Sequence, residues 1–302
     1  MRKKKIEEEY NQKIQKLIEL NKFYYEYNSP KVDDREYDAI KNDILQLENK
    51  YSYLKNKNSP SLNVGFKPSK NFKKVPHRVP MLSLANAFDQ NDLDNFEKKI
   101  MNYLHQKDRL EIEYSAEPKI DGISASLLYK NGNFVTGLSR GDGKEGEDIS
   151  ENLKTIDDIP QKISSKDFPD DIDIRGEIFI ETNDFKKLGN KFANPRNAAS
   201  GSLRQKNPLE TKKIPLKFIA YTFGYEKGLK ISKQSEFLKK LKEWGFKTNP
   251  LNKTIKGIKN LMKNYKEIEN KRGNLNFDID GLVYKINDFK LQKRLGNVAN
   301  AP

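Results

Sequence analysis

The sequence predicts an α+β fold in which a small helical module precedes a larger domain of antiparallel strands and flanking helices. Apolar residues recur at three- and four-residue spacing early in the chain, which is typical of amphipathic helices. From Glu111 the apolar period becomes two, which is typical of strands. Asn131-Gly132 then supplies a strong two-residue hairpin signal. We place the module at residues 1–68 and the larger domain at 69–302.

The module is expected to consist of two antiparallel helices. The first covers residues 6–27 and ends at Asn28-Ser29-Pro30, whose proline disfavours further helix. The second begins behind Asp33, because Glu36 stands three residues later and completes a capping box. Residues 52–80 show no period and contain four prolines and a glycine, which predicts a linker or an irregular entry into the next domain.

The larger domain alternates helical and strand patterns. In order, we expect a helix from Asp89 through Leu104, strands around 123–129 and from Phe134 toward 139–143, a turn at 142–148, a strand over 172–180, a β-rich segment at 216–225, helices around 237–244 and 255–268, and a strand at 277–285. The strand at 172–180 has isoleucines on one face. Charged residues and Phe179 occupy its other face, so that face is not expected to be purely solvated.

The segment from Phe192 to Arg204 combines small residues with Arg196 and Arg204. Such a composition suits close backbone approach and phosphate contact by arginine. A serine- and glycine-containing loop without a ligand explains the same residues about equally well. Both interpretations stay open from the residues alone.

The hexapeptide Glu117-Pro118-Lys119-Ile120-Asp121-Gly122 is the most informative stretch. In extended backbone Glu117, Lys119 and Asp121 share one face. The simpler interpretation is a hairpin turn at Asp121-Gly122 with solvated charge pairs. The alternative is a nucleophilic lysine, which needs neighbouring cations or burial to lose its proton.

Composition narrows the class of protein. The chain of 302 residues has 57 lysine and arginine residues against 43 acidic ones, a net charge of +14 that favours polyanionic partners. No apolar run approaches the roughly 18 residues of a membrane span. There is neither a secretory signal nor a cysteine. We therefore expect a cytoplasmic monomer without membrane attachment, whose metal, if any, is bound by oxygen atoms and is magnesium rather than zinc.

Several motifs, taken together and in order, resemble the N-terminal part of bacterial NAD-dependent DNA ligases. Lys119-Ile120-Asp121-Gly122 matches the Lys-x-Asp-Gly motif, which ATP-dependent ligases and RNA capping enzymes share. More specific strings are Pro80-Met81-Leu82-Ser83-Leu84, Arg140-Gly141-Asp142-Gly143, Arg175-Gly176-Glu177, Asn194 to Ala199 and Phe277 to Gly281. Tyr24-Tyr25 with Asp34-Arg35-Glu36-Tyr37-Asp38 is the aromatic and acidic pattern of the NAD-using branch.

The resemblance implies a nucleotidyltransferase fold, like that of DNA ligases and capping enzymes, in which Lys119 attacks the adenylyl phosphorus of NAD. The same resemblance assigns the binding residues. Glu117 would contact the adenine edge, Tyr221 would stack on the ring, and Tyr24 and Tyr37 would enclose the nicotinamide. The full set of implied NAD-binding residues is Tyr24, Tyr25, Asp34, Arg35, Glu36, Tyr37, Asp38, Ser83, Leu84, Glu117, Asp121, Arg140, Glu177, Arg196, Arg204, Tyr221 and Lys285. Glu177 and Asp280 are the implied magnesium ligands.

The family continues with an OB-fold, a four-cysteine zinc module, helix-hairpin-helix repeats and a BRCT domain, which this sequence lacks. We therefore expect the chain to be part of a longer protein that seals nicked double-stranded DNA in replication and repair, with zinc only in the missing part. Ala85-Asn86 departs from the family pattern and receives no role. Two rivals remain: an ATP-dependent nucleotidyltransferase of the same superfamily, and a non-catalytic basic nucleic-acid-binding protein.

Overall fold

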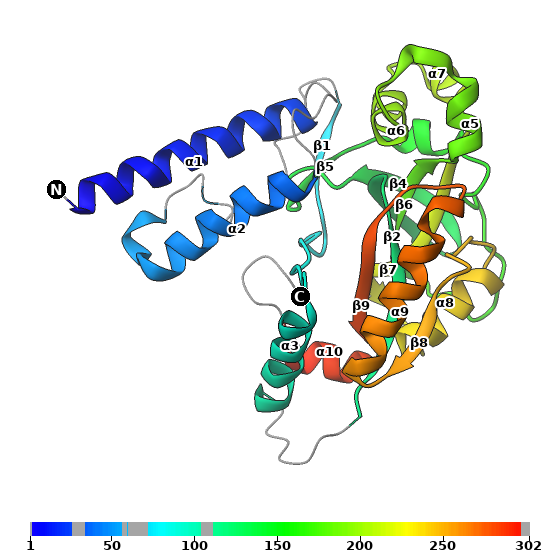
Figure 1. Ribbon diagram of the computed structural model, residues 1–302. Helices are drawn as coiled ribbons and strands as arrows, with labels where there is room; N and C mark the ends of the chain where they lie inside the picture. Colours follow the sequence, from blue (N-terminus) through cyan, green and yellow to red (C-terminus); the bar gives the residue numbers. More distant parts are fainter. Residues whose placement is uncertain (1, 26–33, 56–58, 60–71, 104–110, 297–302) are drawn as a thin grey trace. The chain divides into compact units, whose positions relative to one another are not determined.

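The computed structural model describes residues 2–25, 34–55, 59, 72–103 and 111–296 (Figure 1). The chain forms two compact units. One comprises Met1–Leu84, Arg140–Glu147 and Asn297–Ala301, and the other Ala85–Ser139 and Asp148–Gly296. The predicted domain boundary at residue 68 and most of the predicted linker lie outside the described residues.

The helices and strands follow the predicted α+β order. The α-helices are α1 (Arg2–Tyr25), α2 (Asp34–Lys50), α3 (Gln90–Tyr103), α4 (Ser150–Leu153), α5 (Thr182–Lys187), α6 (Pro195–Leu203), α7 (Pro208–Lys212), α8 (Gln234–Glu243), α9 (Ile258–Lys271) and α10 (Phe289–Leu295). The strands are β1 (Lys74–Pro76), β2 (Glu113–Ile120), β3 (Ile123–Lys130), β4 (Asn133–Ser139), β5 (Glu145–Glu147), β6 (Asp171–Ile180), β7 (Leu216–Lys227), β8 (Lys253–Lys256) and β9 (Ile279–Ile286). Short 3₁₀ helices occupy Ser52–Leu54, Gly189–Lys191 and Arg272–Asn274.

The helices α1 and α2 pack against each other through the predicted apolar stripes. Tyr10, Ile14 and Leu17 of α1 and Ile44 of α2 are buried in one cluster. The Tyr10 hydroxyl donates a 2.8 Å hydrogen bond to Oε1 of the buried Glu48, and Ser59 donates to the same oxygen. Burial, followed by the hydrogen bond and charge of Glu48, raises the pKa of Tyr10 above its usual value.

The second unit contains two antiparallel sheets. One has the strand order β8-β2-β9 and the other the order β4-β3-β6-β7. The β3–β4 hairpin turns at Asn131-Gly132, and both residues have positive φ, at 47° and 73°. This prediction is confirmed, because a type I′ turn requires positive φ at both central residues.

The strand β6 is covered on both faces. Its isoleucines are buried as predicted, and Asp173, Arg175 and Phe179 on the other face are at most 9% exposed. Gly176 allows the close approach of β7, since a Cβ there would lie 2.3 Å from the Phe218 ring and 2.4 Å from the Ile219 carbonyl oxygen. The expectation that the charged face is not a solvated surface is therefore confirmed.

The predicted hairpin at Asp121-Gly122 is wrong. The strand β2 pairs with β8 and β9, whereas β3 pairs with β4 and β6, so the chain passes from one sheet to the other at these two residues. The Asp121 amide donates to the Asp278 carbonyl at 2.9 Å instead of closing a turn. Gly122 lies so close to β6 that a Cβ would stand 2.3 Å from the Ile178 carbonyl oxygen.

Two further segments differ from the prediction. The loop interpretation of 192–204 fails because α6 occupies most of it: Asn194 accepts a 2.7 Å hydrogen bond from the Asn197 amide as the N-cap, and Pro195 stands at the first helical position. The predicted helix from Ile255 begins three residues later. Ile255 belongs to β8, and Gly257, with φ 74°, separates that strand from α9.

Candidate active site

Lys119 lies at the end of β2, opposite Gly281 of β9. A β-bulge between Lys119 and Ile120 interrupts the ladder directly after the lysine. Its Nζ is 2.5 Å from Oδ2 of Asp280, and the lysine side chain is 45% exposed. Desolvation lowers the pKa of Lys119, but the charge and hydrogen bond of Asp280 outweigh it, so this pKa is raised above its usual value. The amine is therefore held in place in its protonated form.

Asp121 forms the second ion pair of this region. The Arg196 Nη1 donates to Asp121 Oδ1 at 2.7 Å, from the first turn of α6. Desolvation raises the pKa of Asp121 and the charge of Asp280 adds to the effect, whereas Arg196 opposes both. The charges of Arg196 and Glu177 also act on Lys119. Lys119 and Arg196 are thus each paired with a carboxylate, and the charge of Glu177 also acts on Lys119.

Glu117 lies two residues before Lys119 and is 4% exposed. Its Oε1 accepts hydrogen bonds from Ser115 Oγ at 2.8 Å and from Gln234 Nε2 at 2.9 Å. Its Oε2 accepts one from Lys285 Nζ at 2.8 Å. A buried carboxylate in an apolar environment is costly, and these three donors compensate it.

Tyr221, on β7, completes this group. Its carbonyl oxygen accepts from Gln234 Nε2 at 2.7 Å and from Lys285 Nζ at 3.1 Å. The same ammonium group lies 5.3 Å from the centre of the Tyr221 ring, within the range of a cation–π interaction. The predicted base-contacting residues Glu117, Lys285 and Tyr221 are therefore adjacent at the boundary between the two sheets.

Glu177, on β6, stands opposite Ser124 of β3 and accepts a 2.8 Å hydrogen bond from its hydroxyl. The Cγ of Glu177 would lie 2.9 Å from a Cβ at residue 122, so Glu177 packs against the backbone that connects Lys119 to β3. Arg204 is the C-cap residue of α6 and is partly exposed. Glu177 thus contacts the connection that follows Lys119, and Arg204 lies at the end of the helix that carries Arg196.

Ser83, Leu84 and Arg140 belong to the other unit. There the pairing of β1 with β5 brings residues 74–83 beside residues 140–147: His77 Nε2 is 3.0 Å from the Arg140 carbonyl oxygen, and the Met81 amide donates to the Gly143 carbonyl at 2.8 Å. Arg140 Nη2 is 3.5 Å from the Leu82 carbonyl oxygen. Their contact with a nucleotide held at Lys119 stays a prediction.

The structure does not describe the side chains of most of the predicted nicotinamide residues. These are Tyr24, Tyr25, Asp34, Arg35 and Asp38, whose backbone lies in α1 and α2. Of the remaining two, Tyr37 packs against the buried cluster of the helix pair, and Glu36 is exposed and accepts a 3.4 Å hydrogen bond from Lys16. The role of the whole set in binding stays a prediction.

Three residues of the site were not predicted. Ser115 and Ser124 each hold a carboxylate, and Gln234 binds both Glu117 and Tyr221. Strand periodicity could have indicated Ser115, which is two residues from Glu117 and therefore on the same face. Nothing local in the sequence links Gln234 to Glu117, since the two residues are 117 positions apart.

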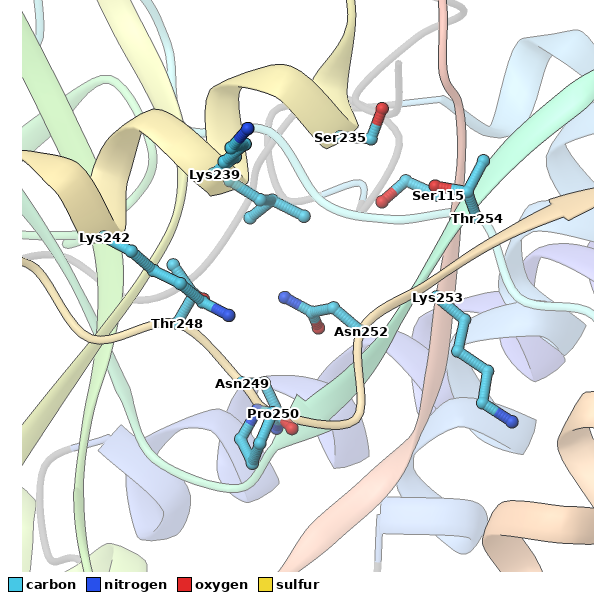
Figure 2. A pocket seen from close by; sticks show the side chains of 11 residues that line it. Ser115, Ser235, Lys239, Lys242, Thr248, Asn249, Pro250, Asn252, Lys253 and Thr254 are labelled. Atoms are coloured by element: carbon cyan, nitrogen blue, oxygen red, sulfur yellow. The ribbon is translucent and has the colours of Figure 1, made fainter.

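A cavity of about 210 Å³ lies beside this network (Figure 2). It shares Ser115 with the Glu117 group, and Figure 2 shows Lys242 and Asn252 directed toward its interior. The other lining residues are Ser235, Leu238, Lys239, Thr248, Asn249, Pro250, Lys253 and Thr254. None of the residues predicted to bind NAD lines it.

The carboxylates around Lys119 fit only a metal that takes few protein ligands. Asp280 is engaged by Lys119, Asp121 by Arg196 and Glu177 by Ser124. Within the described ranges no three acidic or histidine side chains gather as a metal-binding group. Magnesium commonly uses one or two carboxylates and completes its shell with phosphate oxygens and water, so Asp280 and Glu177 remain compatible with it.

No helix in the described part is long and apolar enough to cross a membrane.

Two family models match the chain. The model of the NAD-dependent DNA ligase adenylation domain matches residues 69–302, and the model of the DNA ligase-like N-terminal NAD⁺-binding domain matches residues 3–65. Among solved structures, the ATP-dependent DNA ligase of bacteriophage T7 in complex with ATP aligns with 64% of this chain and 61% of its own, at 18% identity and a TM-score of 0.34. That score is too low to argue a shared fold.

Curated relatives agree with the family models. A DNA ligase of Pelagibacter ubique is 65% identical over the whole chain, which spans 45% of that protein. DNA ligases of Parvibaculum lavamentivorans and Rickettsia bellii are 43% and 44% identical over 93% and 99% of the chain, which spans 41% and 45% of them. The chain thus spans less than half the length of these relatives. Because the adenylation-domain model covers most of its residues, the chain belongs to the NAD-dependent DNA ligase family.

Proposed function

We propose that the chain performs the adenylation step of DNA ligation. In this step Lys119 Nζ attacks the adenylyl phosphorus of NAD and forms a nitrogen–phosphorus bond. The bond from that phosphorus to the bridging oxygen breaks, nicotinamide mononucleotide leaves with the electron pair, and the amine loses its proton. The observation that supports this most directly is the surroundings of Lys119: it pairs with Asp280, feels the charge of Arg196, and follows Glu117 by two residues on β2.

The neighbouring residues supply binding and charge. Glu117 and Lys285 would contact the edge of adenine, and the Tyr221 ring would stack on its face. Arg196 and Arg204 would contact phosphate oxygens, where guanidinium groups bind well. Ser83, Leu84 and Arg140 would contribute from the other unit, and the helix pair would bind the nicotinamide half through Tyr24, Tyr37 and the acidic residues near them.

Asp280 has two roles in this proposal. It orients Nζ, and it keeps the amine protonated until its own charge is compensated. A magnesium ion held by Asp280 and Glu177 together with phosphate oxygens would neutralise charge on the carboxylates and on the phosphate. Arg196 already supplies positive charge beside Lys119, and this charge also lowers the pKa of the lysine.

The whole ligase, of which this chain matches less than half, would use the lysyl adenylate to seal nicked double-stranded DNA during replication and repair. The net charge of +14 fits such a polyanionic partner. We propose a cytoplasmic monomer.

The choice of nucleotide tests this proposal. With NAD and magnesium the chain is expected to gain one adenylate, measured by intact-protein mass spectrometry, and to release nicotinamide mononucleotide. With ATP in place of NAD no gain is expected. A gain from ATP alone would support the ATP-dependent rival. If neither nucleotide adds mass while DNA binding is salt-sensitive, the chain is a non-catalytic nucleic-acid-binding protein.

Replacing Asp280 with asparagine is expected to move the pH dependence of adenylation. The charge and hydrogen bond of Asp280 raise the pKa of Lys119, so their loss lowers that pKa and the reactive neutral amine forms at lower pH. The midpoint of the rising limb of a single-turnover pH–rate profile should therefore shift toward acid, whatever happens to the maximal rate. Asp184→Asn, which breaks a surface pair with Lys187, is the control and should not shift it. A midpoint that stays in place or moves to higher pH contradicts this role.

A further inference from the structure

Gln234 connects the two sheets at the proposed base site. It is the first residue of α8 and is 1% exposed. Its amide nitrogen donates to Glu117 on β2 at 2.9 Å and to the Tyr221 carbonyl on β7 at 2.7 Å. Both neighbours are acceptors only, so the amide orientation is fixed: the nitrogen must face them and both of its hydrogens are used.

Counted over the residues that the structure describes, the bonds to Glu117 leave one acceptor position on its carboxylate. An ionised carboxylate offers about four lone-pair positions. Ser115 and Gln234 occupy the two on Oε1, and Lys285 occupies one on Oε2. The remaining position is on Oε2, beside the Lys285 ammonium group. It can accept from a donor on a base and repels a carbonyl oxygen.

We infer that Gln234 is a positioning residue that sets base selectivity, because it holds Glu117 with a single acceptor position directed at the edge of the base. This inference rests on the proposed function, in which Glu117 contacts adenine. Without the bond from Gln234, the Glu117 carboxylate would keep only Ser115 and Lys285 and could rotate about its terminal torsion, which is soft. It could then present either oxygen, and Lys285 could turn toward a carbonyl. The distinction between an amino group and a carbonyl on the base would be weakened.

Nearby contacts make Gln234 the specific determinant. Lys285 also binds both Glu117 and Tyr221, but its ammonium is flexible and can rotate its donors, whereas the planar amide cannot. The backbone of Gln234 is also held in place, since its backbone N–H donates to the Asn287 carbonyl oxygen at 2.8 Å. The side chain therefore has a fixed origin and two fixed acceptors.

The experiment compares NAD with nicotinamide hypoxanthine dinucleotide, whose base has a carbonyl where adenine has the amino group. Single-turnover adenylation of the 302-residue chain is followed by intact mass, and the half-saturating concentration and maximal rate are obtained for each dinucleotide. The unchanged chain should prefer NAD by at least about tenfold, because a site built around a buried hydrogen-bonding group rejects an analogue that leaves it unpaired. Gln234→Met, which keeps the length without donors, should lose most of that preference, mainly through the half-saturating concentration.

Three further variants make the outcome decisive. Gln234→Glu keeps the size and removes the donors, so it should lose the preference as well. Gln292→Met removes a comparable glutamine bond, 2.7 Å to the Ile286 carbonyl, away from Glu117, and should keep the preference. If Gln234→Met slows both dinucleotides equally, or changes neither, Gln234 is only structural and the inference is wrong. If Glu117→Gln also leaves the preference unchanged, the proposed contact of Glu117 with the base is wrong too.

Discussion

Replacing Lys119 with arginine is expected to abolish transfer of AMP from NAD to the chain, with a rate lower by more than about 10⁴-fold, the scale observed when a nucleophile is removed. Arginine keeps the positive charge and can still pair with Asp280, 2.5 Å from Nζ in the present arrangement. Its guanidinium group stays protonated and cannot act as the nucleophile. The measurement is intact mass after incubation with NAD and magnesium.

The matched control for this variant is Lys253→Arg. Lys253 also forms a short ion pair from the end of a strand, 2.8 Å from Glu267, but on β8. The Lys253→Arg variant should become adenylated on Lys119 at the rate of the unchanged chain. If the Lys119→Arg variant is adenylated at a rate within about tenfold of that of the unchanged chain, another residue is the nucleophile.

Replacing Gly122 with alanine is expected to lower the stability of the chain markedly. The added Cβ would meet the Ile178 carbonyl oxygen at 2.3 Å, and a backbone oxygen within a paired strand cannot move aside as a side-chain end could. Overpacking of this kind costs about 1–3 kcal/mol of unfolding free energy, or more where the backbone must shift. The strain falls between Lys119 and Glu177, so adenylation should slow as well.

Urea denaturation measures the loss of unfolding free energy in Gly122→Ala. Single-turnover mass spectrometry measures its adenylation rate. Gly273→Ala is the control, because among the described residues, apart from its chain neighbours, no atom lies within 4 Å of the Cβ it would add. Its stability should change by no more than about 0.5 kcal/mol. Equal stabilities of the two alanine variants would contradict the close packing of Gly122 against β6.

The same glycine shows where sequence reasoning is reliable and where it is not. Asn131-Gly132 forms its hairpin because a two-residue turn depends on local backbone conformation alone. Asp121-Gly122 has the same local signal, but β2 finds its partners in β8 and β9, more than 130 residues later. Strand pairing is non-local, so no local signal determines it. The N-cap and proline at Asn194-Pro195 were present in the sequence and could have predicted α6.

The candidate site divides in the same way. The roles of Glu117, Lys119, Lys285 and Tyr221 were predicted from the resemblance to the family, and the structure brings Glu117, Lys285 and Tyr221 into contact. Lys119 pairs with Asp280, and Asp121 with Arg196, because the fold places β9 and α6 beside the end of β2. The spacing of these residues along the chain does not determine that placement. Gln234 was missed because its partners lie on two strands of different sheets.

The site of AMP attachment shows directly whether Lys119 is the nucleophile. After incubation with NAD and magnesium, the chain is digested and fragmented under conditions that preserve the phosphoramidate bond, and the adenylate is located by mass spectrometry. A single adenylate on Lys119 is expected. An adenylate on any other residue, or a chain that releases nicotinamide mononucleotide without becoming modified, would contradict it.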